Sequence, residues 1–139
     1  MYAFYKSHDS FKLLIQLIKK ARSSKFSVSL VLENEAQIQE FSTKFWNMND
    51  TIIHGVISDG FIEKQPVILD INLQKKDVAI IYANGNCDYE KLKQYQRVFF
   101  IEAPTSTMES EYLSDNCKYW MIKNAAWTEV SKAEFSQKQ

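Results

Sequence analysis

The chain has 139 residues, of which 45% are hydrophobic and 24% are charged. This composition is typical of a folded globular protein and excludes a disordered one. Seventeen basic and seventeen acidic side chains cancel, so no net field attracts a nucleic-acid backbone, and we expect no direct DNA or RNA binding.

Cysteine usage and the first residues point to one compartment. Cys87 and Cys117 are the only cysteines, and their spacing indicates neither a disulfide framework nor a zinc site. The chain does not open with a signal-peptide pattern, and no segment approaches the ~18 apolar residues of a membrane span. We therefore expect a cytoplasmic protein.

Predicted strands and helices alternate along the chain. Residues 1–6 predict a strand, followed by a helix that ends near residue 23 and a strand over residues 26–32. Asn34 and Gln37 resemble a capping box that opens a second helix. The remaining strands are expected at Thr51–Ile57, Pro66–Leu73, Asp77–Tyr82 and Arg97–Ala103, with a short helix over Asp88–Tyr95. This order predicts a three-layer, Rossmann-like α/β domain with a mostly parallel central sheet and helices on both faces.

The last third of the chain predicts one more helix. Ser106 and Glu109 form a second capping box, and the helix is expected to reach about Lys123. Trp127 and its neighbours then predict a final strand or tail. We expect a single domain over residues 1–132 and a frayed tail over residues 133–139.

Trp46 is the most informative residue of the second helix. At ~100° per residue, Trp46 projects roughly 120° away from the centre of the apolar stripe. With Ile52, Ile53 and His54 close behind, it predicts an anchor of a protein interface. The alternative is that Trp46 covers a second core under a neighbouring loop. The stripe itself consists of Ile38, Phe41, Phe45 and Met48.

No catalytic motif is evident. The three glycines are too far apart for a phosphate-binding loop. His8 and His54 lack the spacing that places two ligands on one metal ion. Cys87 follows a turn but has no evident base. We therefore predict a protein with no enzymatic activity, metal or cofactor.

The expected last helix offers a second candidate surface. Its aromatic and basic side chains suit a peptide that carries both an apolar side chain and a carboxylate. A solvated face with lysine stems lying along apolar surface is the alternative. At helical spacing one face carries Leu113, Cys117, Trp120 and Met121, and the other carries Lys118, Tyr119, Ile122 and Lys123.

Five segments, read in order, resemble the chi subunit of bacterial DNA polymerase III: YAFYK, KKARSSKFSVSLVL, FWNMNDTIIHGV, QPVILDINL and KKDVAIIYA. The resemblance spans nearly the whole chain. Its most specific part is Trp46, His54 and the pair Pro66-Val67. The family carries a tryptophan near the end of its second helix, then an apolar-Pro-His element and a Pro-Val strand start. Here Ile53 replaces that proline.

The resemblance implies a non-catalytic accessory subunit of the clamp-loader complex that bridges two proteins. One surface would bind the psi subunit, through Trp46, Thr51, Ile52, Ile53, His54 and Val56. The other would bind the acidic carboxy-terminal tail of single-stranded DNA-binding protein, through Lys118, Tyr119, Trp120, Ile122 and Lys123.

Two departures concern the tail. The family's arginine aligns with Ser114 and an aromatic aligns with Cys117, so tail binding is either lost or shifted toward Trp120 and Lys123. The alternative function is that of a small nucleotide- or metabolite-binding α/β enzyme, which predicts a deep polar pocket at the carboxyl ends of the strands.

Overall fold

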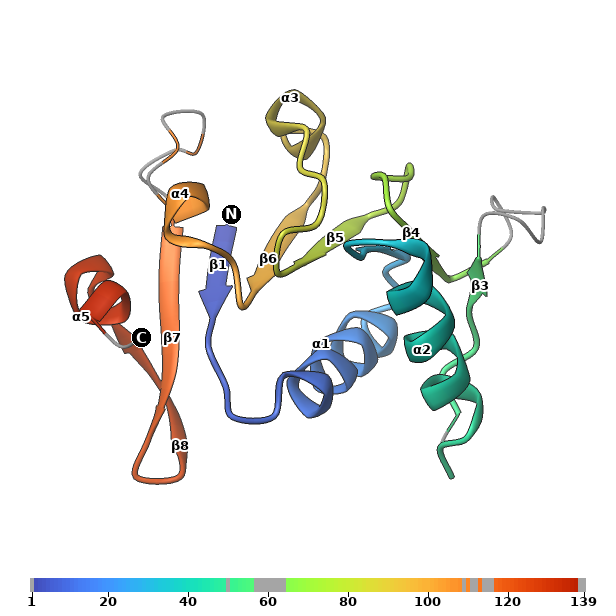
Figure 1. Ribbon diagram of the computed structural model, residues 1–139, viewed down its shortest axis with the longest axis horizontal. Coiled ribbons are helices and arrows are strands. Elements are labelled where there is room, and N and C mark those ends of the chain that lie inside the picture. The colour runs from blue at the N-terminus through green and yellow to red at the C-terminus, as the bar shows by residue number, and fades with distance from the viewer. Residues whose placement is uncertain are drawn as a thin grey trace.

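Eight strands of this chain lie side by side in one sheet, in the order β3-β4-β2-β5-β6-β1-β7-β8 (Figure 1). The computed structural model describes residues 2–49, 51–56, 65–108, 110, 113 and 117–137. Every neighbouring pair of described strands is parallel except β7 and β8. The strands are β1 (Tyr2–Tyr5), β2 (Val28–Val31), β3 (Gly55–Val56), β4 (Val67–Asp70), β5 (Val78–Tyr82), β6 (Arg97–Ile101), β7 (Cys117–Lys123) and β8 (Ala126–Val130). The helices are α1 (Ser10–Ser23), α2 (Glu35–Trp46), α3 (Tyr89–Leu92), α4 (Thr105–Met108) and α5 (Lys132–Gln137).

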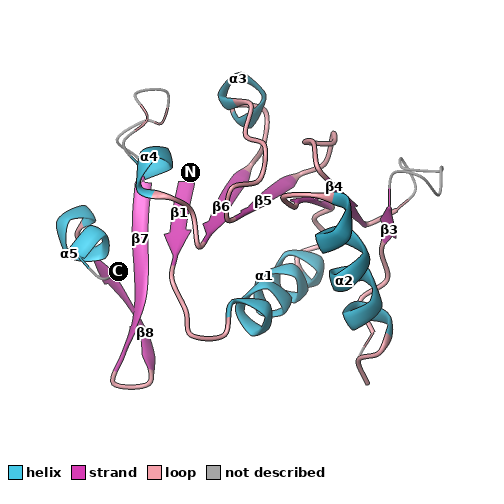
Figure 2. Ribbon diagram, in the orientation of Figure 1, coloured by secondary structure: helices cyan, strands magenta, loops and turns pink. Residues whose placement is uncertain are grey.

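The helices divide between the two faces of this sheet (Figure 2). On one face α1 and α2 bury Leu14 and Phe45 in a core that includes alternate residues of the strands. On the other face the short helices α3, α4 and α5 contribute Leu92, Met108 and Phe135 to a second core. The mostly parallel sheet with helices on both faces is therefore the three-layer α/β fold that the sequence predicts.

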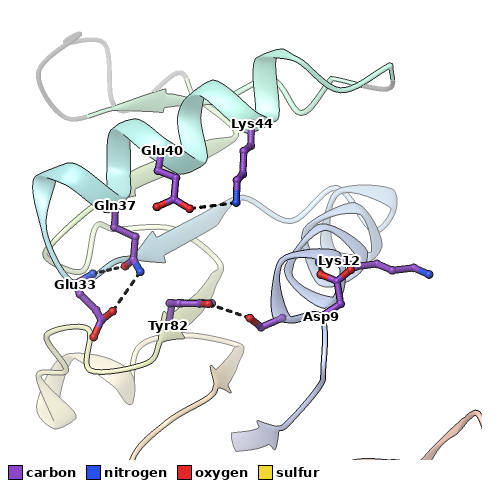
Figure 3. Close-up of polar contacts among 8 residues, drawn as sticks. Asp9, Lys12, Glu33, Gln37, Glu40, Lys44 and Tyr82 are labelled. Carbon is purple, nitrogen blue, oxygen red and sulfur yellow. Dashed lines mark hydrogen bonds and ion pairs between the residues drawn. The ribbon is translucent and has the colours of Figure 1, made fainter.

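Capping side chains explain where α1 and α2 begin. The Asp9 carboxylate accepts a hydrogen bond from the Lys12 backbone N–H at 3.0 Å. The Asn34 side chain accepts one from the Gln37 N–H at 2.9 Å. Gln37 Oε1 accepts one from the Glu33 N–H at 2.8 Å (Figure 3). These bonds satisfy amide groups that have no partner within their own helix. The capping box predicted at Asn34 is present, with its return bond directed to the residue before the cap.

The last predicted helix is wrong, because Cys117–Lys123 forms the strand β7. In the described part of the segment before it, the helix is the short α4 (Thr105–Met108). The physical reason is that the apolar residues of CKYWMIK fit the two-residue period of a strand as well as they fit the period of a helix. As a strand, this segment pairs with β1 on one side and with β8 on the other. The capping partner Glu109 lies outside the described residues.

A tight hairpin stabilises β7 as a strand. Only Asn124 and Ala125 connect β7 to β8, and both have positive φ angles, 51° and 63°. Two-residue connections with positive φ at both positions match the right-handed twist of paired strands. The final strand expected around Trp127 is therefore confirmed as β8.

Two other segments differ from the sequence-based expectation. Of the strand expected over residues 51–57, only Gly55–Val56 is extended in a sheet, and residue 57 lies outside the described residues. Where fraying is expected, α5 (Lys132–Gln137) buries Phe135. The Phe135 ring packs against Tyr119 with planes tilted by 53°, and the Phe135 carbonyl oxygen accepts a hydrogen bond from Lys6 Nζ at 2.6 Å. Burying such a ring contributes about 2 kcal/mol, which is enough to hold a short helix on the sheet.

Candidate functional site

Trp46 is the last residue of α2, and 52% of its surface is exposed. Its indole ring packs against the imidazole of His54, with ring centroids 4.4 Å apart and planes tilted by 33°. Ile53, next to His54 in the chain, is 65% exposed. We call the exposed side chains of Trp46, Thr51 and Ile53 the Trp46 surface. The predicted orientation of Trp46 away from the core stripe is confirmed.

His54 supports this surface from beneath. Only 5% of His54 is exposed, and its ring meets Phe45 edge-on at 5.3 Å. Its Nδ1 lies 2.8 Å from the carbonyl oxygen of Ile52, which can only accept, so Nδ1 carries a proton and donates it. Its Nε2 lies 2.7 Å from the hydroxyl oxygen of Ser42 on α2. The two bonds hold the imidazole in one orientation, and the imidazole in turn positions the indole.

The six residues expected to bind psi fall into two groups. Trp46, Thr51 and Ile53 are exposed, and the Thr51 hydroxyl donates to the carbonyl of Met48 at 2.9 Å. Ile52 and His54 are buried, and Val56 is partly buried on β3. The first group can touch a partner, whereas the second forms the support.

Ser42→Ala should test this support. The change removes the hydroxyl that pairs with His54 Nε2, and we expect the free energy of unfolding to fall by about 1–2 kcal/mol, as measured by urea denaturation. Ser23→Ala is a matched control, because the Ser23 hydroxyl bonds an exposed helix carbonyl of Lys20. Equal effects of the two changes would contradict a special role for the Ser42–His54 contact.

The residues expected to bind the acidic tail lie on a strand and so face opposite sides of the sheet. Lys118, Trp120 and Ile122 alternate toward the α1 side, where Trp120 packs against the first core. Tyr119 is 91% buried in the second core, and Lys123 forms an ion pair with Glu134 of α5. The structure therefore does not bring the five residues together. Ser114 lies outside the described residues.

A pocket of about 300 Å³ opens beside Lys118 and Trp120. It lies between the C-terminal half of α1 and the face of β6, β1 and β7. Its charged lining residues are Lys20 of α1, Arg97 of β6 and Lys118 of β7, and its apolar floor includes Phe99. We call it the basic pocket. Lys20 and Arg97 were missed by sequence reasoning, because residues 20, 97 and 118 come together only through the strand order β6-β1-β7.

Polar groups at the carboxyl ends of the strands bond mainly to one another (Figure 3). Glu33 accepts hydrogen bonds from Gln37 Nε2 and Asn84 Nδ2, each at 3.2 Å, and the hydroxyls of Ser10 and Tyr82 lie 2.9 Å apart. Nearby, a Cβ added at Gly85 would lie 3.0 Å from the carbonyl oxygen of Val31, so this turn favours glycine. The polar groups and the glycine at this edge are thus explained by the packing of the turns.

The described residues offer few groups for chemistry. They contain no cluster of three histidine, cysteine or acidic residues that could hold a metal ion. Burial, with a smaller effect of Asp88, raises the pKa of Cys87 to about 12, so its thiol is protonated at neutral pH and is a poor nucleophile. Within the same residues no helix has the length and apolar character that crossing a membrane requires.

The resemblance to the chi family rests on the segments quoted above and on residue placement. No protein-family model, curated protein or solved structure matches the chain. Membership of the family therefore stays a prediction. The described geometry supplies two surfaces on which to test it, namely the Trp46 surface and the basic pocket.

Proposed function

We propose that this chain is a non-catalytic accessory subunit of the bacterial replicative DNA polymerase clamp-loader complex. It bridges the psi subunit and the carboxy-terminal tail of single-stranded DNA-binding protein in the cytoplasm. The observation that carries the proposal is the Trp46 surface, where an exposed indole and Ile53 lie over a buried histidine that two hydrogen bonds hold in place.

Exposed apolar side chains that lie next to one another mark contact sites, whereas single ones are common on protein surfaces. Among the described residues the large hydrophobic side chains that stay exposed are Trp46, Ile53 and Ile122. The first two form the Trp46 surface, and Ile122 lies on the face of β7 that also carries Lys118 and Trp120. Each of the two residue sets that the resemblance assigns, to psi and to the tail, thus includes apolar side chains that the fold leaves exposed, which supports the proposal.

The Trp46 surface has the anatomy of an interface centre. Tryptophan is enriched among residues that dominate binding energy, and such anchors work best when their orientation is fixed before binding. The contacts of His54 with Ser42 and with the Ile52 carbonyl provide that fixed orientation. An alternative role of Trp46 as the cover of a second core does not fit a side chain that is half exposed.

The tail contact is expected on the α1 side of β7. Lys118 supplies charge, and Trp120 and Ile122 supply apolar surface, for a peptide that carries acidic and apolar groups. Tyr119 and Lys123 are left out of this contact, since one is buried and the other is paired with Glu134.

The alternative function, a small nucleotide- or metabolite-binding enzyme, has less support. The basic pocket lies on the face of the sheet and reaches Arg97 and Val78, the first residues of β6 and β5, rather than the crevice beyond the carboxyl ends. Among the described residues its lining includes no histidine, cysteine or carboxylate that could act as a general base or nucleophile.

Reconstitution with purified partners tests the proposal. The chain should co-elute with the cognate psi subunit in size-exclusion chromatography, and adding full-length single-stranded DNA-binding protein should produce a larger complex that contains all three. The matched control is single-stranded DNA-binding protein without its tail, which should leave the binary complex unchanged. Failure of the chain to bind psi, at concentrations that saturate a micromolar interaction, would contradict the proposal.

A further inference from the structure

Three cations line the basic pocket, namely Lys20, Arg97 and Lys118. Among the residues that the structure describes, no aspartate or glutamate lines it. Within the described part of the chain none of the three forms an ion pair or a side-chain hydrogen bond. A chain with no net charge thus gathers three positive charges around one cavity, without an ion-pair partner among the described residues. Like charges held together repel one another, so an anionic ligand would relieve an existing cost.

The negative end of α1 does not cancel this field. The carbonyls at that end already accept hydrogen bonds, Lys20 and Ala21 from the Ser24 N–H and Arg22 from the Lys25 N–H. A helix terminus is equivalent to about half a charge, whereas the pocket holds three full charges. The balance at the pocket therefore favours anions.

The pocket also offers aromatic faces for a planar group. The rings of Tyr5 and Trp120, on paired positions of β1 and β7, are nearly parallel, with planes 12° apart and centroids 6.4 Å apart. A flat group can therefore lie parallel to both rings. Phe26 and Phe99 complete the apolar lining. Stacking of a base on such rings is worth about 1–3 kcal/mol and tolerates any base.

From this combination we propose that the basic pocket binds a nucleoside phosphate. The base would stack against the Trp120 and Tyr5 rings, and the phosphate, which only accepts hydrogen bonds, would be held by the donor-only groups of Lys20, Arg97 and Lys118. A volume of about 300 Å³ suits one nucleotide unit and not a tracked strand. The ligand is thus either a free mononucleotide or the phosphorylated end of a single strand.

Nucleotide binding at this pocket does not depend on the proposed adaptor function, but one consequence of it does. Lys118 and Trp120 are also the residues proposed to contact the acidic tail. A nucleoside phosphate and the tail would then exclude each other at this pocket, so that occupancy by one regulates attachment to the other. The Trp46 surface shares none of the pocket's lining residues, so psi binding would be unaffected.

Isothermal titration of the full-length chain with adenosine 5′-monophosphate tests the binding. Adenosine and ribose 5-phosphate are the probes that lack the phosphate and the base, and each should bind at least tenfold more weakly than the nucleotide. Oligothymidylate with and without a 5′-phosphate identifies the source. If the phosphorylated strand binds more tightly than the mononucleotide, a strand end is the ligand, and otherwise a free nucleotide is.

Single substitutions locate the site. Arg97→Gln and Lys118→Gln should each weaken nucleotide binding by about tenfold, because each removes one charge-assisted contact. Lys12→Gln is the matched control on α1, since the Lys12 side chain points away from the neighbouring elements (Figure 3), and it should leave the affinity unchanged. Thermal melting checks that each variant is folded.

Three results would overturn the inference. The first is the absence of saturable heat with the mononucleotide at millimolar concentration. The second is an affinity for adenosine equal to that for the mononucleotide. The third is a loss of nucleotide affinity in Lys12→Gln equal to that in Arg97→Gln and Lys118→Gln. If an acidic peptide with a free carboxyl terminus binds and the nucleotide does not, the pocket belongs to the tail alone, and the adaptor function stands while the nucleotide site falls. If the nucleotide binds and psi does not, the nucleotide site stands and the adaptor function falls.

Discussion

Replacing Trp46 by alanine is expected to weaken binding of the psi subunit by about 100-fold, which corresponds to about 3 kcal/mol. The side chain is 52% exposed before binding, and its ring is already oriented by contact with His54. Its removal deletes the largest apolar anchor of the Trp46 surface without disturbing the buried residues of α2. Titration calorimetry with the purified psi subunit measures the change directly.

The fold should survive this substitution. Because half of the indole is in solvent, we expect the free energy of unfolding to fall by less than about 1 kcal/mol in urea denaturation. Ile122→Ala is the matched control, since Ile122 is also an exposed large hydrophobic residue, 43% exposed, but lies on β7. A psi affinity that is equal in the Trp46→Ala variant and the unaltered chain would contradict the assignment of this surface.

The first part of the fold follows from local signals. Asn34 caps α2 where the sequence predicts a cap, and the apolar stripe of α2 puts Phe45 in the core. The exposure of Trp46 follows from the same 100° geometry. These features depend on residues within a few positions of one another, and so one sequence is sufficient to predict them.

Other features depend on residues far apart in the chain. CKYWMIK fits both a helix and a strand, and its pairing with β1 decides between them. The turn at Asn124 and Ala125 lacks glycine, which weakened the hairpin signal. Likewise Lys20 and Arg97 line one pocket only because α1 packs across β6 and β1, and no local sequence pattern predicts that arrangement.

The correction from helix to strand makes a sharp prediction for the tail. On the expected helix Lys118 and Lys123 both belong to the face assigned to the tail, so charge reversal at either should weaken tail binding. On β7 they face opposite sides of the sheet, and Lys123 is paired with Glu134. We therefore expect Lys118→Glu to weaken binding of a tail peptide by about 30-fold, because it replaces attraction by repulsion at the pocket.

Lys123→Glu should leave tail affinity within about twofold of the unaltered chain, because screening weakens a charge on the far face. Fluorescence anisotropy of a labelled tail peptide, at two salt concentrations, measures both variants. Weakening by Lys118→Glu should shrink at high salt, since the contact is exposed. Equal weakening of tail binding by both substitutions would contradict a strand at this position. Unchanged tail binding in both variants would contradict the assignment of the tail site to β7. The strand geometry places Lys118 in the lining of the basic pocket and Lys123 against Glu134 of α5, so the two lysines are required to behave differently.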